Sequence, residues 1–269
     1  MENKDINISV CLVVYNEEKN IRRCLDSLHD VVDEIIVVHD GDCLDRTLDI
    51  CQEYGAKIFM RPHAGMMEAH LVFAIEQARG RWVLRIDADE FLSEGLKSNL
   101  RGLIKKAEIE GISAYSFRWL DYPGRKSGRA KKQKSILFKK AELYWFSMPH
   151  LSWQTRKRLE ESNLILGHAP KDYETSVYWD GQKKWASIQA RYILEDFDNL
   201  DNFQASRGDW LKVYGFSRRY AGSRFLSVMK FFKSFGETFL GGAGLEESWR
   251  CGLYNFYLGK YLYDLVHHR

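Results

Sequence analysis

The chain has 269 residues, 45% of them hydrophobic and 29% charged, with a formal net charge of +3. This composition is ordinary for a soluble globular protein, and the length suffices for one large domain or two small ones. The five cysteines show no metal-binding spacing, and their odd number argues against a disulfide framework. Because the N-terminus is charged and no apolar run reaches about 18 residues, we expect neither a signal peptide nor a spanning helix. A reduced, cytoplasmic setting is predicted.

The first 110 residues alternate between strand and helix patterns. Apolar runs at 8–14, 34–38, 57–60 and 81–86 predict strands, the first of them covered on both faces. Between these runs, apolar residues at helical spacing predict helices, and a further helix begins at Ser93. The alternation with short connections predicts an α/β fold with a mainly parallel sheet and right-handed crossovers.

The pattern changes after Gly111. Alternating aromatic residues at 115–119 predict a half-exposed strand, and a return strand is expected at 136–138. A further strand at 164–166 ends at Gly167 and His168. From about Trp185 to the C-terminus, the pattern predicts helices.

Two carboxylates follow the strand predicted at 81–86. Asp87 and Asp89 are two residues apart, so in an extended chain they face the same side. At the carboxyl end of a parallel strand they would lie where open α/β sheets bind ligands. Paired carboxylates repel each other unless a cation or a hydrogen-bonding ligand compensates, and Mg²⁺ or Mn²⁺ carrying a diphosphate would do so. The simpler alternative is an acidic loop that follows a strand.

Polar loops follow three of the predicted strands and would converge on one crevice. They contain Tyr15, Asn16 and Glu17, then His39, Asp40 and Gly41, then Asp87 and Asp89. Asp40 could accept hydrogen bonds from a base or ribose, and Arg61 or Arg85 could offset phosphate charge. Taken singly, Asn16 could be a helix cap, Asp40 part of a turn and Arg61 a solvated surface charge. The occurrence of all three loops in this order favours a shared nucleotide site.

Four segments carry a family resemblance. They are Val13-Val14-Tyr15-Asn16-Glu17-Glu18, Val37-Val38-His39-Asp40-Gly41 with Asp45-Arg46-Thr47, Ala78-Arg79-Gly80, and Ile86-Asp87-Ala88-Asp89-Glu90. Together they resemble the N-terminal half of family 2 glycosyltransferases, which have the GT-A fold. The resemblance implies a nucleoside-diphosphate-sugar donor, a Mn²⁺ or Mg²⁺ ion and inversion at the anomeric carbon. It also implies site roles: Tyr15, Glu17 and Asp40 hold the nucleoside, Asp87 contacts ribose or metal, and Asp89 binds the metal.

The chain also departs from the family pattern. The family's second motif usually reads Asp-Asp-Gly-Ser or Asp-Ser-Gly-Ser, whereas here His39 precedes Asp40 and residues 42–44 lengthen the turn. Base contacts and donor identity therefore stay open. The second half resembles, loosely, the lipopolysaccharide-core glucosyltransferase branch, which often has a His-Glu pair in its acceptor half. Here His150 is followed by Leu151.

On this resemblance we divide the chain into three parts. Residues 1–110 form the nucleotide-sugar-binding half of a GT-A domain, 111–184 the acceptor-binding half, and 185–269 a helical, membrane-associating region. An inverting displacement needs a general base beside the acceptor hydroxyl. Residue type and region make candidates of Glu90, Asp121, His150 and His168. His168 could instead be a third metal ligand, because it follows a strand and imidazole is compatible with Mn²⁺; a packed or surface histidine is the alternative.

Two basic segments could bind an anionic acceptor or an anionic membrane. Residues 125–140 contain eight basic residues and no acidic one, which predicts a solvated loop or attraction to an anionic acceptor. Residues 216–233 interleave basic and apolar side chains, which predicts either a helix packed on the catalytic domain or one lying on an anionic membrane. We expect a cytoplasmic protein, peripheral on the inner face of the membrane, that builds a cell-surface glycan or glycolipid without binding nucleic acid. Transfer to a polyprenyl phosphate and a non-catalytic nucleotide-sugar-binding role are the alternatives.

Overall fold

The structure, a computed structural model, describes residues 7–121, 133–147, 152–169, 175–194, 197–218, 224–240 and 245–267. It contains an eight-stranded sheet with the order β3-β2-β1-β4-β7-β6-β10-β5 and a three-stranded sheet with the order β11-β8-β9. The strands are β1 (Ile8–Val14), β2 (Glu34–Asp40), β3 (Lys57–Arg61), β4 (Trp82–Arg85), β5 (Glu90–Leu92), β6 (Ile112–Asp121), β7 (Gln133–Lys139), β8 (Leu143–Phe146), β9 (Gln154–Thr155), β10 (Arg158–His168) and β11 (Asn202–Phe203). The helices are α1 (Ile21–Leu28), α2 (Thr47–Glu53), α3 (Glu68–Gln77), α4 (Glu94–Glu110), α5 (Thr175–Leu194), α6 (Arg207–Arg218), α7 (Arg224–Leu240) and α8 (Leu245–His267), with short 3₁₀ turns at Lys140–Glu142 and Phe197–Asn199.

The large sheet is parallel in its first half and mixed in its second. Strands β3, β2, β1 and β4 run parallel to one another, as the strand–helix alternation predicts. Strand β7 lies between β4 and β6 and is antiparallel to both, while β10 is parallel to β6. The carboxyl ends of β1, β2 and β4 therefore meet at one edge, where the three polar loops emerge.

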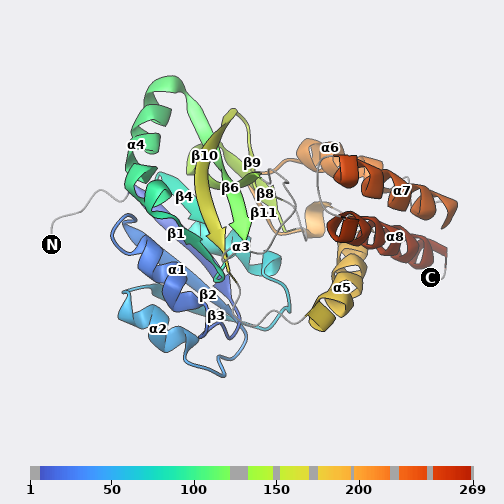
Figure 1. The fold of residues 1–269 in the computed structure, drawn as a ribbon, viewed down its shortest axis with the longest axis horizontal. Helices are drawn as coiled ribbons and strands as arrows, with labels where there is room; N and C mark the ends of the chain where they lie inside the picture. The colour runs from blue at the N-terminus through green and yellow to red at the C-terminus, as the bar shows by residue number, and fades with distance from the viewer. Residues whose placement is uncertain are drawn as a thin grey trace.

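Helices cover both faces of this sheet (Figure 1). One apolar layer packs α1, α2 and α4 against the sheet, and the second packs α3 against the opposite face. Every residue of β1 and β2 is buried, which is why these segments are almost continuously apolar. Helix α4 begins at the predicted residue: the Ser93 hydroxyl accepts a hydrogen bond from the Leu96 N–H, and Gly111 ends the helix at φ 69°.

Two local predictions were wrong. The strand at 115–119 is not half-exposed, because β6 pairs on both edges and residues 112–117 are buried on both faces. Tyr115 belongs to one apolar layer and its neighbour Ala114 to the other. Asn16 is not a helix cap, because α1 begins only at Ile21 and Asn16 has left-handed backbone (φ 53°).

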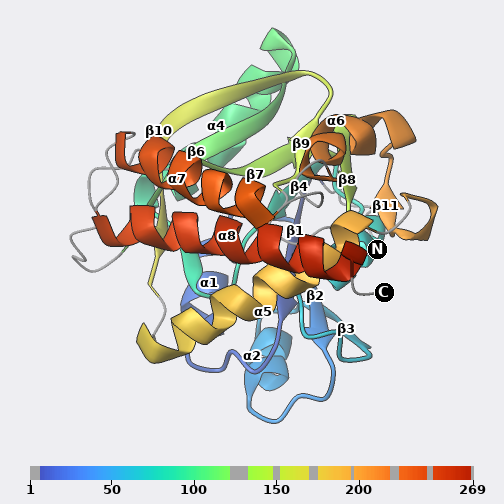
Figure 2. The same cartoon turned by 90° about the vertical axis from the view of Figure 1, so that its right-hand side faces the viewer.

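The C-terminal helices form a separate apolar cluster. It joins α5, α6 and α8 to Phe146 of β8, and the helical region begins at Thr175 rather than at the predicted residue 185. Helices α7 and α8 lie side by side on the outer face (Figure 2). The Arg156 guanidinium, from the loop after β9, reaches Asp209 of α6 at 3.0 Å. Within the described helices, none combines the length and apolarity that crossing a bilayer requires.

Candidate functional site

The loops after β1 and β2 are joined to each other. The Glu17 N–H donates a hydrogen bond to the Thr47 hydroxyl at 2.6 Å, and the Glu18 N–H donates to Asp45 Oδ2 at 3.0 Å. The Thr47 hydroxyl in turn donates to Asp45 Oδ1 at 2.5 Å. These bonds fix the first loop against the start of α2, so the side chain of Glu17 has a defined place at the end of β1.

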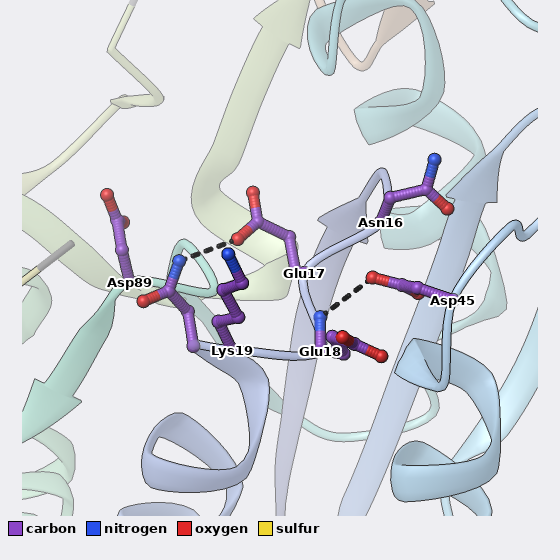
Figure 3. Close-up of a pocket in the computed structure, with 7 residues that line it drawn as sticks. Asn16, Glu17, Glu18, Lys19, Asp45 and Asp89 are labelled. Atoms are coloured by element: carbon purple, nitrogen blue, oxygen red, sulfur yellow. Dashed lines mark hydrogen bonds between the residues drawn. The ribbon is translucent and has the colours of Figure 1, made fainter. Parts of the chain in front are cut away.

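Two cavities meet at Glu17. The smaller has a volume of about 360 Å³ and is strongly acidic, with Asp89 on one side, Asp45 on the other, and Glu17 and Lys19 between them (Figure 3). Its lining residues are Asn16, Glu17, Glu18, Lys19, Asn20, Asp45 and Asp89. Burial raises the pKa of Glu17 above its ordinary value, and the nearby carboxylates of Asp89 and Asp45 add to this although Asn20 donates a hydrogen bond. The arrangement favours a cation or a proton at this point.

The larger cavity has a volume of about 570 Å³ and a more apolar lining. It is bounded by Val13, Val14, Tyr15, Glu17, Asp40, His63, Gly65, Met66, Met67, Glu68, Arg85, Asp87, Ser152 and Lys184. The half-exposed Tyr15 ring lies 4.9 Å from the His63 ring, forming an aromatic wall. Arg85 contributes a buried Nε atom that has no hydrogen-bond partner in the described part of the chain. An aromatic wall beside a guanidinium group suits a base and a phosphate.

Asp89 and His168 come together as a pair. His168 Nε2, at the end of β10, lies 3.1 Å from Asp89 Oδ2, and the Ala169 N–H donates to the Asp89 carbonyl at 2.9 Å. The Trp119 ring lies 4.4 Å from the His168 ring. Among the residues that the structure describes, no three His, Cys, Asp or Glu side chains are grouped for a metal. Asp87 is not part of this pair.

Asp87 is engaged by two basic side chains instead. Lys134 Nζ lies 2.6 Å from Asp87 Oδ2, and the Arg85 guanidinium lies 3.7 Å from Asp87 Oδ1. Burial alone would raise the pKa of Asp87, but these two cations lower it to about 2. Asp87 is therefore ionised and already neutralised by the protein.

The surroundings of Glu90 argue against its predicted role as the general base. Its side chain is 1% exposed and accepts hydrogen bonds from the Trp119 indole at 2.6 Å, from Lys134 at 2.6 Å and from the Asp87 N–H at 3.0 Å. Burial and the neighbouring Asp87 raise the pKa of Glu90 above its ordinary value. Because these partners occupy both oxygens away from solvent, the structure does not support Glu90 as a general base.

The other candidate bases are less fully described. Asp121 is the last residue of β6, and its side chain lies outside the described part of the chain, as does the whole of His150. Their role as a base stays a prediction.

Asp40 lines the larger cavity, and its carboxylate is engaged by neighbouring groups of the protein. Oδ1 accepts from the Ala64 N–H at 2.5 Å and lies 2.8 Å from His70 Nε2, while Oδ2 accepts from the Gly65 N–H at 2.9 Å and lies 3.2 Å from His63 Nδ1. Three hydrogen bonds thus reach the carboxylate, while His63 Nδ1 also lies 3.1 Å from the Asp40 backbone carbonyl. Burial opposes ionisation, yet these hydrogen bonds keep the pKa of Asp40 below its ordinary value. Asp40 thus fixes the loop at 63–65, and its contact with a base or ribose stays a prediction.

The two predicted arginines have different places. Arg85 faces the larger cavity, whereas the Arg61 guanidinium lies 4.6 Å from the Phe73 ring of α3 and is absent from the described lining of either cavity. Sequence reasoning missed His63 and Lys134. Lys134 lay within the basic segment at 125–140, and nothing in that segment distinguishes it. The antiparallel β4–β7 register, which pairs Leu84 with Leu137, carries Lys134 to the loop that holds Asp87.

Comparison with known proteins identifies the family. A family model described as glycosyl transferase family 2 matches residues 9–162. The chain is 34% identical over 113 residues to an uncharacterized glycosyltransferase of Rickettsia typhi, which covers 42% of this chain and 38% of that protein. It is 32% identical over 114 residues to the glycosyltransferase SunS of Bacillus phage SPbeta, which covers 41% of this chain and 27% of SunS. The match thus spans well under half the length of these curated relatives.

Solved structures show the same fold. S. aureus TarS 1–349, crystallised with UDP-GlcNAc, superposes with a TM-score of 0.51 at 13% identity and covers 98% of this chain and 93% of that one. The mannosyltransferase PcManGT of Pyrobaculum calidifontis, solved with GDP-Man and Mn²⁺, gives a TM-score of 0.51 at 12% identity and covers 99% and 89%. The α/β fold of GT-A type is therefore confirmed. Because the family model spans more than half of the sequence, the chain belongs to glycosyl transferase family 2.

Proposed function

We propose that this protein is a metal-dependent, inverting glycosyltransferase that moves a sugar from a nucleoside-diphosphate sugar to a cell-surface glycan or glycolipid. The observation that carries the proposal is the pairing of Asp89 with His168 at an acidic cavity that adjoins the Tyr15–Arg85 cavity. The Asp89–His168 pair at the edge of the acidic cavity offers an oxygen and a nitrogen ligand for a cation. The larger cavity offers the Tyr15 ring and the Arg85 guanidinium for a nucleotide.

The larger cavity would hold the donor nucleotide. Tyr15 presents a half-exposed ring on which a base can stack, and Glu17 lines the same cavity, while Asn16 lines the adjoining acidic cavity. Arg85 lines this cavity, so its guanidinium would offset the charge of a phosphate group. The fold relatives TarS and PcManGT were solved with UDP-GlcNAc and GDP-Man, which supports a nucleotide sugar as ligand.

A divalent ion fits the acidic cavity. Asp89 and His168 supply a carboxylate and an imidazole, which are compatible with Mn²⁺ and, for the carboxylate, with Mg²⁺. Four carboxylates, those of Glu17, Glu18, Asp45 and Asp89, line this cavity, and a cation would reduce their mutual repulsion. When bound, such an ion would neutralise charge that develops on the diphosphate leaving group. PcManGT, solved with Mn²⁺, supports this choice.

The test is a thermal-shift panel of UDP, GDP, TDP, CDP and ADP, each with and without Mn²⁺. A ligand that binds only the native state adds about 2.7 kcal/mol of stability at a hundredfold excess over its Kd. We expect one nucleotide to give a Mn²⁺-dependent shift that Asp89→Ala abolishes and that Asp49→Ala, at an exposed position on α2, leaves intact. No shift with any nucleotide would contradict the proposal and favour a role without a nucleotide donor.

The transfer step has its own test. Proton NMR of the product, with the identified donor and a phosphorylated lipid acceptor, reports the anomeric configuration. We expect inversion and a loss of transfer in His150→Ala or Asp121→Asn without a loss of nucleotide binding. Transfer to a polyprenyl phosphate would establish that alternative acceptor. Nucleotide binding without any transfer or donor hydrolysis would favour a non-catalytic binding protein.

We also propose that α7 binds an anionic membrane surface. Val228, Met229, Phe232 and Leu240 are exposed on this helix, and Lys233 is exposed beside them. Apolar and basic side chains on one helix face suit a layer of anionic headgroups. Flotation with phosphatidylglycerol liposomes should occur for the intact protein and fall for Phe232→Ser, but not for Leu211→Ser on α6. Absence of flotation by the intact protein would contradict the proposed membrane binding.

A further inference from the structure

Lys134 of β7 sits between two carboxylates of the acidic motif. Its Nζ lies 2.6 Å from Asp87 Oδ2 and 2.6 Å from Glu90 Oε1. The lysine side chain is 24% exposed and that of Glu90 is 1% exposed. Two contacts of this length to ionised groups are charge-assisted hydrogen bonds, the strong class of such bonds.

The position of Lys134 is fixed from the buried side. Glu90 also accepts hydrogen bonds from the Trp119 indole and the Asp87 N–H, so its carboxylate cannot turn away. A buried carboxylate without a cation would be costly, and Lys134 is the cation that the sheet supplies. Strand β7 pairs with β4 and β6, which holds the lysine backbone beside the loop that carries Asp87.

Asp87 and Asp89 therefore have different partners. Lys134 holds Asp87 Oδ2 and Arg85 approaches Oδ1, whereas Asp89 faces His168 and the acidic cavity. A divalent ion drawn to Asp87 would have to displace an ammonium ion and approach a second fixed positive charge. Lys134 and Arg85 lie within 4 Å of Asp87, so a divalent ion bound there would be strongly repelled by both positive charges, even at the effective dielectric constant of a protein.

We propose that Lys134 is a positioning residue that acts as the permanent counterion of Asp87 and so restricts the divalent ion to Asp89 and His168. This inference rests on the proposed function, since it assigns the ligands of the metal required there. Asp87 is thereby kept ionised, oriented and free of metal, facing the larger cavity where the donor would lie. Such a site holds the ion with few protein ligands, which leaves coordination positions for diphosphate oxygens and water.

The experiment titrates Mn²⁺ alone into the nucleotide-free protein and follows free Mn²⁺ by electron paramagnetic resonance. Lys134→Met removes the counterion and adds Asp87 to the available ligands, so we expect Mn²⁺ to bind about ten- to hundredfold more tightly than to the wild type, the range that changes around a metal site typically produce. Lys134→Arg keeps the charge and should bind Mn²⁺ like the wild type. The double variant Lys134→Met, Asp87→Asn should not show this tighter binding of Mn²⁺.

Lys139→Met is the matched control. Lys139 lies on the same strand and pairs with Glu108 at 2.7 Å, away from both aspartates, so its loss should leave Mn²⁺ affinity unchanged. If circular dichroism shows that Lys134→Met is unfolded, Glu90→Gln is added to it, because this change removes the buried carboxylate that the lysine balances. Mn²⁺ affinity equal to or below that of the wild type in a folded Lys134→Met variant, single or double, overturns the inference.

The nucleotide panel on the wild type separates this failure from failure of the proposed function. If the wild type shows a Mn²⁺-dependent nucleotide shift but Lys134→Met shows no gain in Mn²⁺ affinity, only the role of Lys134 is wrong. If the wild type binds no nucleotide, the proposed function fails whatever the lysine does.

Discussion

His168 Nε2 lies 3.1 Å from Asp89 Oδ2, although 79 residues separate the two side chains in the sequence. A backbone hydrogen bond joins the same two segments, because the Ala169 N–H donates to the Asp89 carbonyl. Arg23 of α1 holds the same two segments together through the carbonyl oxygens of Asp89 and Ala169. The end of β10 and the acidic loop are therefore one structural unit.

The first prediction concerns this pair. If His168 is a metal ligand, His168→Ala should weaken the Mn²⁺ dependence of nucleotide binding by about ten- to hundredfold, because Asp89 alone remains. The measurement is the Mn²⁺ concentration that gives half of the nucleotide-dependent thermal shift. His29→Ala, at an exposed histidine beside Asp30, is the control and should have no effect. Unchanged Mn²⁺ dependence in His168→Ala would remove the ligand role.

A second prediction concerns Gly167, which precedes this histidine. A Cβ at Gly167 would overlap the Phe91 ring of the neighbouring strand β5. Gly167→Ala should therefore lower the free energy of unfolding by about 1–3 kcal/mol and weaken Mn²⁺ binding by displacing His168. Gly102→Ala on α4 meets no atom within 4 Å and should raise stability by about 0.5–1 kcal/mol. Urea denaturation of both variants checks this, and equal stabilities would contradict the predicted overlap.

A third prediction distinguishes two roles for Asp40. Because its two oxygens hold the loop at 63–65, Asp40→Asn would place an amide donor against either the Ala64 or the Gly65 N–H group. We expect a loss of about 2–3 kcal/mol in the free energy of unfolding, even without nucleotide. Asp42→Asn, at an exposed position two residues later, should change stability by less than about 0.5 kcal/mol. Wild-type stability with lost nucleotide binding would instead assign Asp40 to the ligand.

A fourth prediction concerns pH and the docking of α6. Burial opposes ionisation of Asp209, but hydrogen bonds from Ser206 and Arg156 lower its pKa to about 2, against an ordinary value of 3.8. A lowered folded-state pKa stabilises the protein above the unfolded value, and this contribution disappears as pH falls from about 3.8 through about 2. Asp209→Asn should cost about 1 kcal/mol at pH 7, since Arg156 is partly exposed and screened.

Urea denaturation between pH 7 and pH 3 would measure this contribution. The difference in free energy of unfolding between wild type and Asp209→Asn should shrink as pH falls below about 3.8. Asp201→Asn, at an exposed position, should show no such dependence. A difference that stays constant with pH would show that the Asp209 charge does not dock α6.

Much of the fold of the first 110 residues could be predicted from the sequence. The strands at 8–14 and 34–40 are recognisable because burial on both faces requires continuous apolar residues, a property of each segment alone. Asp87 and Asp89 are likewise local, since the same few residues hold the strand end and both carboxylates. The meeting of three loops at one edge follows from parallel strands, and the parallel pairing of β1, β2 and β4 confirms it.

The tertiary structure decided how each of these side chains is used. Lys134 neutralises Asp87 only because β7 inserts between β4 and β6, and no local pattern specifies that insertion. Asp40 binds the loop at 63–65, which follows β3, because that loop offers it two backbone N–H groups. Sequence patterns record burial and local spacing, whereas hydrogen-bond partners depend on which distant strands become neighbours in the sheet. That choice of neighbours is a property of the whole fold.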